Sequence, residues 1–167
     1  SEKQWTKQIG TASSDSSSAV AVDSDNNIYI TGSTNGDIDG SGANTHSGGT
    51  DIFLIKYNPS GAEQWTKQIG TASNDSSSAV AVDSDNNIYI TGSTYGDIDG
   101  SASNTHAGGT DVFLIKYNFS GAEQWTKQIG TSSNDYSNAV AVDSDNNIYI
   151  TGSTGGDIDG SGAGGSD

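Results

Sequence analysis

The sequence predicts an all-β fold, and three observations support that prediction. The segment Gln4–Gly10 recurs at Gln64–Gly70 and at Gln124–Gly130, so the chain repeats every 60 residues. Each repeat contains four short segments rich in β-branched and aromatic residues and bounded by Gly, Asn, Asp and Ser, which is the pattern of strands. No window spaces its apolar residues as a helix for more than one turn, so no helix is expected.

The predicted strands of the first repeat are 19–22, 28–31, 52–57 and 65–69. The five polar residues 23–27 join the first two strands in a tight hairpin. Asp23 and Asp25 within this segment have the alternate spacing of oxygen ligands in a metal-binding loop. The segment is short and lacks Gly, however, so it is interpreted as a turn.

The faces of these strands indicate how the sheets pack. In the third strand Ile52 and Leu54 point to one side and Phe53 and Ile55 to the other, so both sides need covering. The first strand is built of small residues, and the fourth is amphipathic. This gradient predicts sheets packed face to face around an axis, which is the arrangement of β-propeller blades with four antiparallel strands each.

The whole chain, residues 1–167, is therefore predicted to be a single partial β-propeller. Its parts are an outer strand of a preceding blade (4–10), two blades (11–70 and 71–130) and an incomplete blade (131–167). Propellers close with about four to eight blades, so these eleven strands cannot close a ring alone. We favour an open fragment of a longer repeat protein; an oligomeric ring and an open fibre are the alternatives.

The motifs also resemble a known family. Val22–Gly32, Gly36–Gly40, Gly48–Phe53 and Lys56–Asn58 recur in the same order and spacing. They resemble the bacterial seven-bladed β-propeller repeat family (SBBP repeats), and the resemblance covers essentially the whole chain. It implies the propeller fold and an extracellular or cell-surface location, and it implies no catalytic residues.

Composition excludes several classes of partner. The net charge of −15 disfavours nucleic acid and anionic membranes, which both attract Lys and Arg. No apolar run is long enough for a transmembrane helix, so membrane insertion is not expected. The absence of cysteine excludes disulfides and thiolate chemistry. The expected partners are further blades of a longer chain or other copies of this one.

Acidic residues are expected to gather at one end of the blades. Asp37, a hydrophobic residue, Asp39 and then Gly match the opening of a calcium loop, and Asp51 could add a carboxylate, although position twelve is Gly48. The sequence thus offers a possible Ca²⁺ site in each repeat, set against the simpler interpretation that these side chains cap tight turns. The candidate ligands are Asp37, Asp39, Asp51, Asp97, Asp99, Asp111, Asp157 and Asp159.

No catalytic constellation is visible. His46 and His106 are expected to be solvated in polar loops, and no hydrolase elbow motif is present. Trp5, Trp65 and Trp125 are interpreted as packing between blades rather than as sugar platforms. The expected function is that of a non-enzymatic extracellular or cell-surface scaffold for protein interaction, adhesion or assembly. The alternative is a carbohydrate-binding module that uses the long loops between the second and third strands, together with aromatic residues such as Tyr95.

Overall fold

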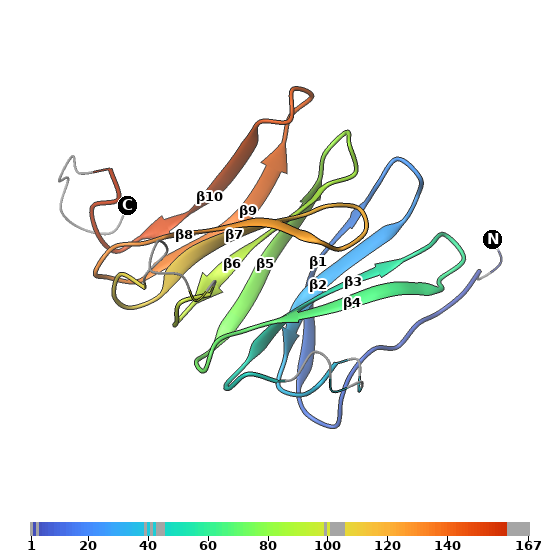
Figure 1. Cartoon of the computed structure of the whole chain (residues 1–167), viewed down its shortest axis with the longest axis horizontal. Coiled ribbons are helices and arrows are strands. Elements are labelled where there is room, and N and C mark those ends of the chain that lie inside the picture. Colours follow the sequence, from blue (N-terminus) through green and yellow to red (C-terminus); the bar gives the residue numbers. More distant parts are fainter. Residues whose placement is uncertain are drawn as a thin grey trace.

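The computed structural model describes residues 2, 4–38, 40, 42, 46–98, 100 and 106–159. Within them lie ten strands and no helix (Figure 1), so no helix of the described part could cross a membrane. The strands are β1 (Asp15–Val22), β2 (Ile28–Thr34), β3 (Asp51–Tyr57), β4 (Glu63–Ile69), β5 (Asp75–Val82), β6 (Ile88–Thr94), β7 (Asp111–Tyr117), β8 (Glu123–Ile129), β9 (Asp135–Val142) and β10 (Ile148–Thr154).

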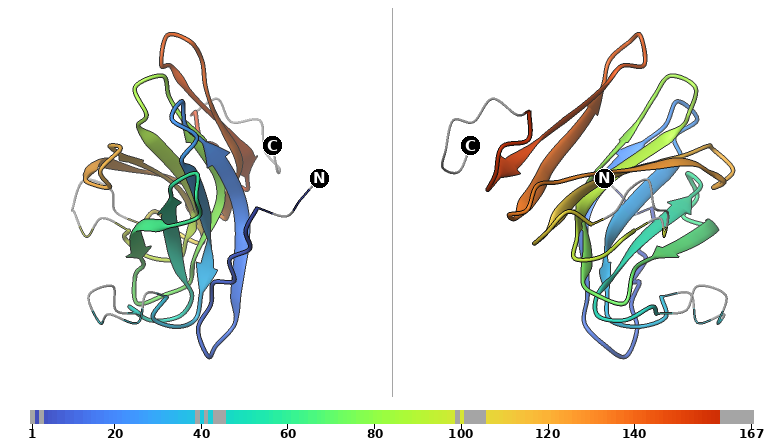
Figure 2. Two further views of the ribbon diagram at one scale, coloured as in Figure 1. Left: turned by 90° about the vertical axis from the view of Figure 1, so that its right-hand side faces the viewer. Right: turned by 60° about the vertical axis from the view of Figure 1, so that its left-hand side comes forward.

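These strands form three antiparallel sheets that follow the repeat. The first sheet has the order β1-β2-β3-β4, the second has the order β5-β6-β7-β8, and β9 pairs with β10 alone. Neighbouring strands in the chain are neighbours in the sheet, which confirms the predicted up-and-down blade. The three sheets lean on one another in succession, and their first hairpins project side by side (Figures 1 and 2).

The strand predicted at residues 4–10 is absent from the described structure. In the complete blades the fourth strand pairs with the third, as Ile69 of β4 does with Ile52 of β3. The segment 4–10 precedes any third strand of the described chain, so it has no ladder partner. It nevertheless covers the outer face of the first sheet: Ile9 packs against the cluster of Phe53, Ile55 and Tyr57.

The main core lies between the first and second sheets. Tyr29, Ile52 and Leu54 of the first sheet face the second, which contributes buried residues to the same cluster. Those residues are Val80, Ile88, Ile90, Phe113, Ile115 and Tyr117. The two-sided apolar pattern of the strands is therefore explained by packing between blades, as predicted.

Identical residues differ in exposure according to whether a neighbouring sheet covers them. Val80 on β5 is 9% exposed, whereas its counterpart Val20 on β1 is 63% exposed. Tyr89 on β6 is 1% exposed, whereas its counterpart Tyr149 on β10 is 56% exposed. Both outer surfaces of the described stack therefore present side chains that are buried in the middle of it.

The hairpin between β1 and β2 forms as predicted, and a carboxylate organises it. Asp23 Oδ1 accepts hydrogen bonds from the amides of Asp25 (3.0 Å) and Asn27 (2.8 Å), and Oδ2 accepts one from the Tyr29 hydroxyl (2.8 Å). Burial raises the pKa of Asp23, but these hydrogen bonds outweigh it and hold the pKa below its usual value. Asn26 has a φ of 62°, a conformation that Asn tolerates.

Candidate functional site

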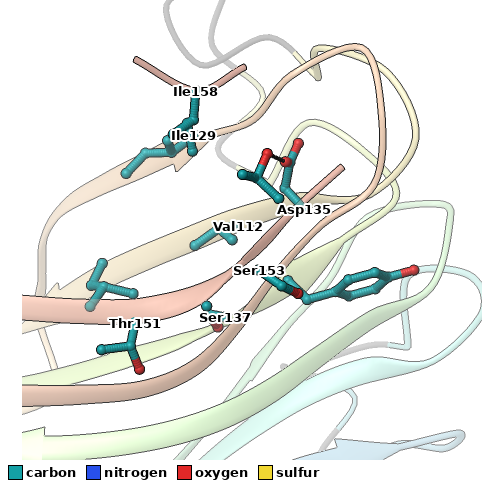
Figure 3. A pocket seen from close by; sticks show the side chains of 11 residues that line it. Val112, Ile129, Asp135, Ser137, Thr151, Ser153 and Ile158 are labelled. Carbon is teal, nitrogen blue, oxygen red and sulfur yellow. Dashed lines mark hydrogen bonds between the residues drawn. The ribbon is translucent and has the colours of Figure 1, made fainter. Parts of the chain in front are cut away.

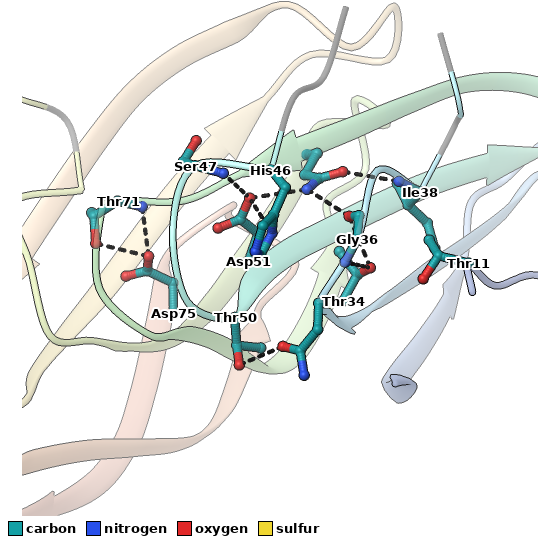
Figure 4. A network of polar contacts seen from close by, with 12 residues as sticks. Thr11, Thr34, Gly36, Ile38, His46, Ser47, Thr50, Asp51, Thr71 and Asp75 are labelled. Atoms are coloured by element: carbon teal, nitrogen blue, oxygen red, sulfur yellow. Dashed lines mark hydrogen bonds and ion pairs between the residues drawn. The ribbon is translucent and has the colours of Figure 1, made fainter. Parts of the chain in front are cut away.

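A buried acid at the start of the third strand organises the long loop of each complete repeat (Figure 4). Asp51 is fully buried, and its Oδ2 accepts hydrogen bonds from the Ser47 amide (2.8 Å) and Gln68 Nε2 (2.9 Å). His46 Nδ1 lies 3.4 Å from the same oxygen. Gln68 also donates to the Gly36 carbonyl and accepts from the Ile38 amide, so it ties the loop to β4.

The second repeat reproduces this network. Asp111 accepts from the Ala107 amide (2.8 Å) and from Gln128 Nε2 (2.9 Å), and His106 Nδ1 lies 3.4 Å from its Oδ2. The sequence analysis predicted that both histidines are simply solvated, and this prediction is wrong. Each histidine lies against a buried carboxylate. The sequence contained a signal for this contact, because His and Asp stand five residues apart in both complete repeats.

A second buried acid begins the first strand of each repeat. Asp75 accepts from the Thr71 amide (2.6 Å), from the Thr71 hydroxyl (2.9 Å) and from the Thr94 hydroxyl. Burial raises the pKa of Asp75, and these hydrogen bonds offset that only in part. Asp15 of the first repeat has the equivalent partners, Thr11 and Thr34, but it is less buried, and its pKa lies below the usual value. Hydrogen-bond donors in the turns and at the strand ends thus satisfy these carboxylates.

The predicted calcium ligands do not come together as a metal cluster among the described residues. Asp37 accepts a hydrogen bond from the Gly42 amide (3.1 Å), which is a turn-capping role. Its Oδ1, and the Oδ1 atoms of Asp51, Asp97 and Asp111, are buried without a hydrogen-bond partner in the described part of the chain. Asp39 and Asp99 lie outside the described residues, whereas Asp157 and Asp159 follow β10 in the incomplete repeat.

Calcium binding therefore stays a prediction, and chelation tests it. If Ca²⁺ occupies these loops, EDTA should lower the melting temperature and millimolar Ca²⁺ should restore it, because a ligand that binds only the folded state stabilises that state. Mg²⁺ at the same concentration is the control for ionic strength. Superimposable melting curves in EDTA and in Ca²⁺ would exclude the site.

Trp5 and Trp65 pack between blades, as predicted, whereas the ring contact of Trp125 is with Tyr89 of its own sheet. Trp65 of β4 lies against Gly121 in the turn between β7 and β8 of the next blade, and its ring centroid is 6.0 Å from that of Tyr29. Trp5 repeats the contact one blade earlier: it lies against Gly61, and its Nε1 donates to the Pro59 carbonyl (3.2 Å). Gly61 and Gly121 have φ values of 80° and 82°, so both the backbone and the neighbouring ring favour glycine there.

A cavity of about 350 Å³ separates the incomplete blade from the second sheet (Figure 3). Val112, Ile129, Ile150, Gly152 and Ile158 are among the residues that line it. The equivalent positions between the first and second sheets are filled, because the Phe113 ring lies against Gly92 there. Gly152 has no such ring among the described residues, and β10 pairs with β9 alone. The cavity therefore marks the position of the third strand's Phe in a complete blade.

Another cavity, of about 380 Å³, lies between the inner strands β5 and β9, and it brings together two exposed aromatic side chains. Tyr95, which the sequence had identified as a variable loop aromatic, lines it together with Tyr136. Tyr136 and the neighbouring Asn138 were missed by sequence reasoning. Their signal was that both replace Ser of the two other copies.

Comparison with known proteins agrees with this architecture. The chain is 29% identical over 189 residues to an uncharacterized WD repeat-containing protein of Acanthamoeba polyphaga mimivirus, covering 91% of this chain and 13% of that protein. It is 29% identical over 123 residues to the regulatory protein FlaEY of Caulobacter vibrioides, covering 68% of this chain and 12% of that protein. The chain thus spans about an eighth of each of these relatives.

A family model adds the more specific match. The model of the beta-propeller repeat (SBBP) matches residues 4–39, 64–99 and 124–159, which cover β1 and β2 and their counterparts in the other copies. The three matches recur at the 60-residue spacing of the sequence. The second and third each span the last strand of one sheet, β4 or β8, and the first two strands of the next. With its repeats, strand order and packing between blades, the chain belongs to the SBBP beta-propeller repeat family.

Proposed function

We propose that this chain is a non-enzymatic scaffold for protein interaction, adhesion or assembly in an extracellular or cell-surface protein. The observation that carries the proposal is the pair of open sheet surfaces. One end presents Val20 and Val22, which are 63% and 55% exposed, and the other presents Tyr149, which is 56% exposed. Repeats that bury their apolar faces only against neighbours need a further sheet at each end.

The acidic, cysteine-free composition and the family resemblance support the extracellular setting. The two relatives, described as a WD repeat-containing protein and as a regulatory protein, are in keeping with a role in interaction. The acids of the described loops serve as hydrogen-bond acceptors for neighbouring backbone amides and side chains, which suits a structural role.

Light scattering tests the proposal. The isolated 17.0 kDa chain should self-associate as its concentration rises, because burying the open apolar faces lowers the free energy. The double variant Val20→Lys, Val22→Lys should shift the population toward the monomer. The control is Gln64→Lys, Gln124→Lys, which adds the same charge at exposed positions of β4 and β8. A monomer at every concentration, or equal effects of both variants, would contradict assembly through these faces.

Carbohydrate binding is the second candidate function, and a specific observation favours it. Tyr95, in the long loop after β6, is 50% exposed and lines a cavity with a second tyrosine. Aromatic faces stack on the apolar faces of sugar rings, whereas hydroxyls and amides bind their hydroxyl groups. An array of immobilised glycans should give reproducible signals with the intact chain. An array without signals would exclude this candidate and leave the scaffold proposal untouched.

A further inference from the structure

We propose that the cavity between β5 and β9 is a binding groove for a neutral oligosaccharide, with Tyr95 and Tyr136 as its stacking surfaces. This inference rests on the second candidate function and gives it a location. The groove, named here the tyrosine groove, has a volume of about 380 Å³. It is lined by Asn74, Ser76, Ser78, Ser93, Tyr95, Thr110, Tyr136, Ser137 and Asn138.

Several of the differences between the repeats fall in this groove. The first two copies differ at only seven positions, and two of them, Ser14 to Asn74 and Asn35 to Tyr95, change groove residues. The third copy then introduces Tyr136 and Asn138, where the second copy has Ser76 and Ser78. Asn74 accepts a hydrogen bond from the Thr50 amide (3.0 Å) of the preceding blade, so its change has a packing role. The strands do not require Tyr95, Tyr136 and Asn138, because another copy has Asn or Ser at these positions. An exposed surface on which two tyrosines replace the polar residues of another copy is a candidate for contact with a ligand outside the fold.

The strands present these side chains to solvent rather than to the core. Ser137, between the two new residues, is 4% exposed, and its hydroxyl donates to the Gly92 carbonyl (3.1 Å) of the preceding sheet. Its neighbours on β9 alternate to the other side of the strand, so that Tyr136 is 41% exposed. Tyr95 is 50% exposed, and its backbone amide is held by the Asn74 carbonyl (3.1 Å). Each aromatic therefore stands on an ordered part of the backbone with its ring accessible.

The groove also offers polar groups that the described fold does not use. The side chains of Tyr95, Tyr136 and Asn138 make no hydrogen bond to other described residues, and neither do those of Ser76, Ser78 and Ser93. This contrasts with the Thr and Asp side chains of the same strand ends, which hydrogen-bond within the protein. Two phenols, three serine hydroxyls and a carboxamide can donate and accept in many directions.

These features favour an uncharged, hydroxyl-rich ligand. No charged side chain and no aliphatic side chain lines the groove, so it offers neither an ion-pair partner nor an apolar pocket for a peptide anchor. The net charge of −15 repels polyanions such as nucleic acids and sulfated glycans. A neutral sugar presents apolar ring faces for the tyrosines and hydroxyls for the surrounding polar groups.

The chain supplies its own matched variant for the test. At the equivalent junction of the first and second copies, the corresponding residues are Asn35, Ser76 and Ser78. The triple variant Tyr95→Asn, Tyr136→Ser, Asn138→Ser therefore gives the groove the residues that the other junction already has. Its melting temperature should stay that of the unchanged chain, since exposed substitutions are close to neutral. The control is Phe119→Pro, which restores the residue at position 59 and removes an aromatic that is 61% exposed outside the groove.

The probes are immobilised neutral gluco-, manno- and galacto-oligosaccharides and N-acetylhexosamine oligosaccharides, with sulfated glycans as the negative comparison. The best neutral probe is then titrated calorimetrically. The triple variant should bind it at least about tenfold more weakly than the intact chain, because binding energy concentrates in aromatic contacts, and Phe119→Pro should bind it equally well. Unchanged binding by the triple variant would overturn the groove assignment while carbohydrate binding itself stands. An intact chain that binds no neutral probe would overturn both.

Discussion

Replacing Phe113 with alanine is expected to lower the free energy of unfolding by about 4 kcal/mol, which is the typical loss for a buried aromatic residue. Phe113 on β7 is fully buried between the first two sheets, within the cluster that contains Ile52, Ile90 and Tyr29. Its ring lies against Gly92, where an added Cβ would approach the ring to 2.6 Å. Neither neighbouring sheet can close over the lost ring without shifting its strands.

Phe53 is the matched control, because it occupies the same position in the first repeat. It is 4% exposed, but it faces the outer side of the stack, where Ile9 and Ile38 cover it instead of a sheet. Such a cover can relax or admit water, so we expect Phe53→Ala to cost about half as much as Phe113→Ala. Urea unfolding followed by tryptophan fluorescence measures both. Equal losses would contradict the conclusion that a neighbouring sheet stabilises this position more than the cover by Ile9 and Ile38 does.

Replacing Thr94 with valine is expected to cost about 3 kcal/mol at neutral pH, although the two side chains have the same shape. The Thr94 hydroxyl donates to the carboxylate of Asp75 and accepts a hydrogen bond from the Gly96 amide (3.0 Å). Both Thr94 and Asp75 are fully buried, so water cannot replace the lost donor. Hydrogen bonds to charged groups are worth about 1.5–3 kcal/mol, and the Gly96 amide adds the cost of a lost neutral one.

Acid should reduce this loss. Burial raises the pKa of Asp75, so this carboxyl takes up a proton in the folded state at a higher pH than an ordinary Asp. Once protonated, it needs fewer donors, and the difference in stability between the original chain and Thr94→Val narrows as pH falls through that raised pKa. Thermal melts of both proteins between pH 7 and acid follow the effect. A difference that does not change with pH would show that the hydroxyl does not act through the carboxylate.

Thr34→Val in the first repeat is the control for burial. Thr34 donates to Asp15 (2.5 Å), but Asp15 is only partly buried, and hydrogen bonds hold its pKa below the usual value despite the opposing effect of burial. We expect a smaller loss at neutral pH, because water can reach Asp15. The narrowing with acid should begin only below the ordinary pKa of 3.8, and therefore at lower pH than for Thr94→Val.

The sequence predicted the blade itself because each sheet is built from short-range patterns. Alternation in Ile52–Tyr57 identified a strand covered on both sides, and the polar run 23–27 identified the hairpin. The 60-residue period gave the number of sheets and their order. The segment 4–10 shows the limit of such patterns, because it repeats the sequence of β4 and β8 and yet forms no strand. β4 pairs with β3 of its own sheet, and no third strand of the described chain lies beside the segment 4–10.

The candidate sites depend on residues that local patterns do not connect. Tyr95 and Tyr136 stand 41 positions apart, and only the packing of β9 against β5 brings them to one groove. The exposure of Val20 and the burial of Val80 likewise follow from which sheet has a neighbour. The sequence by itself determined strands, turns and repeat order, since these follow from side-chain alternation and local hydrogen bonds. Only the tertiary structure decided which faces are covered and which side chains converge, since contacts between blades join positions about one repeat apart.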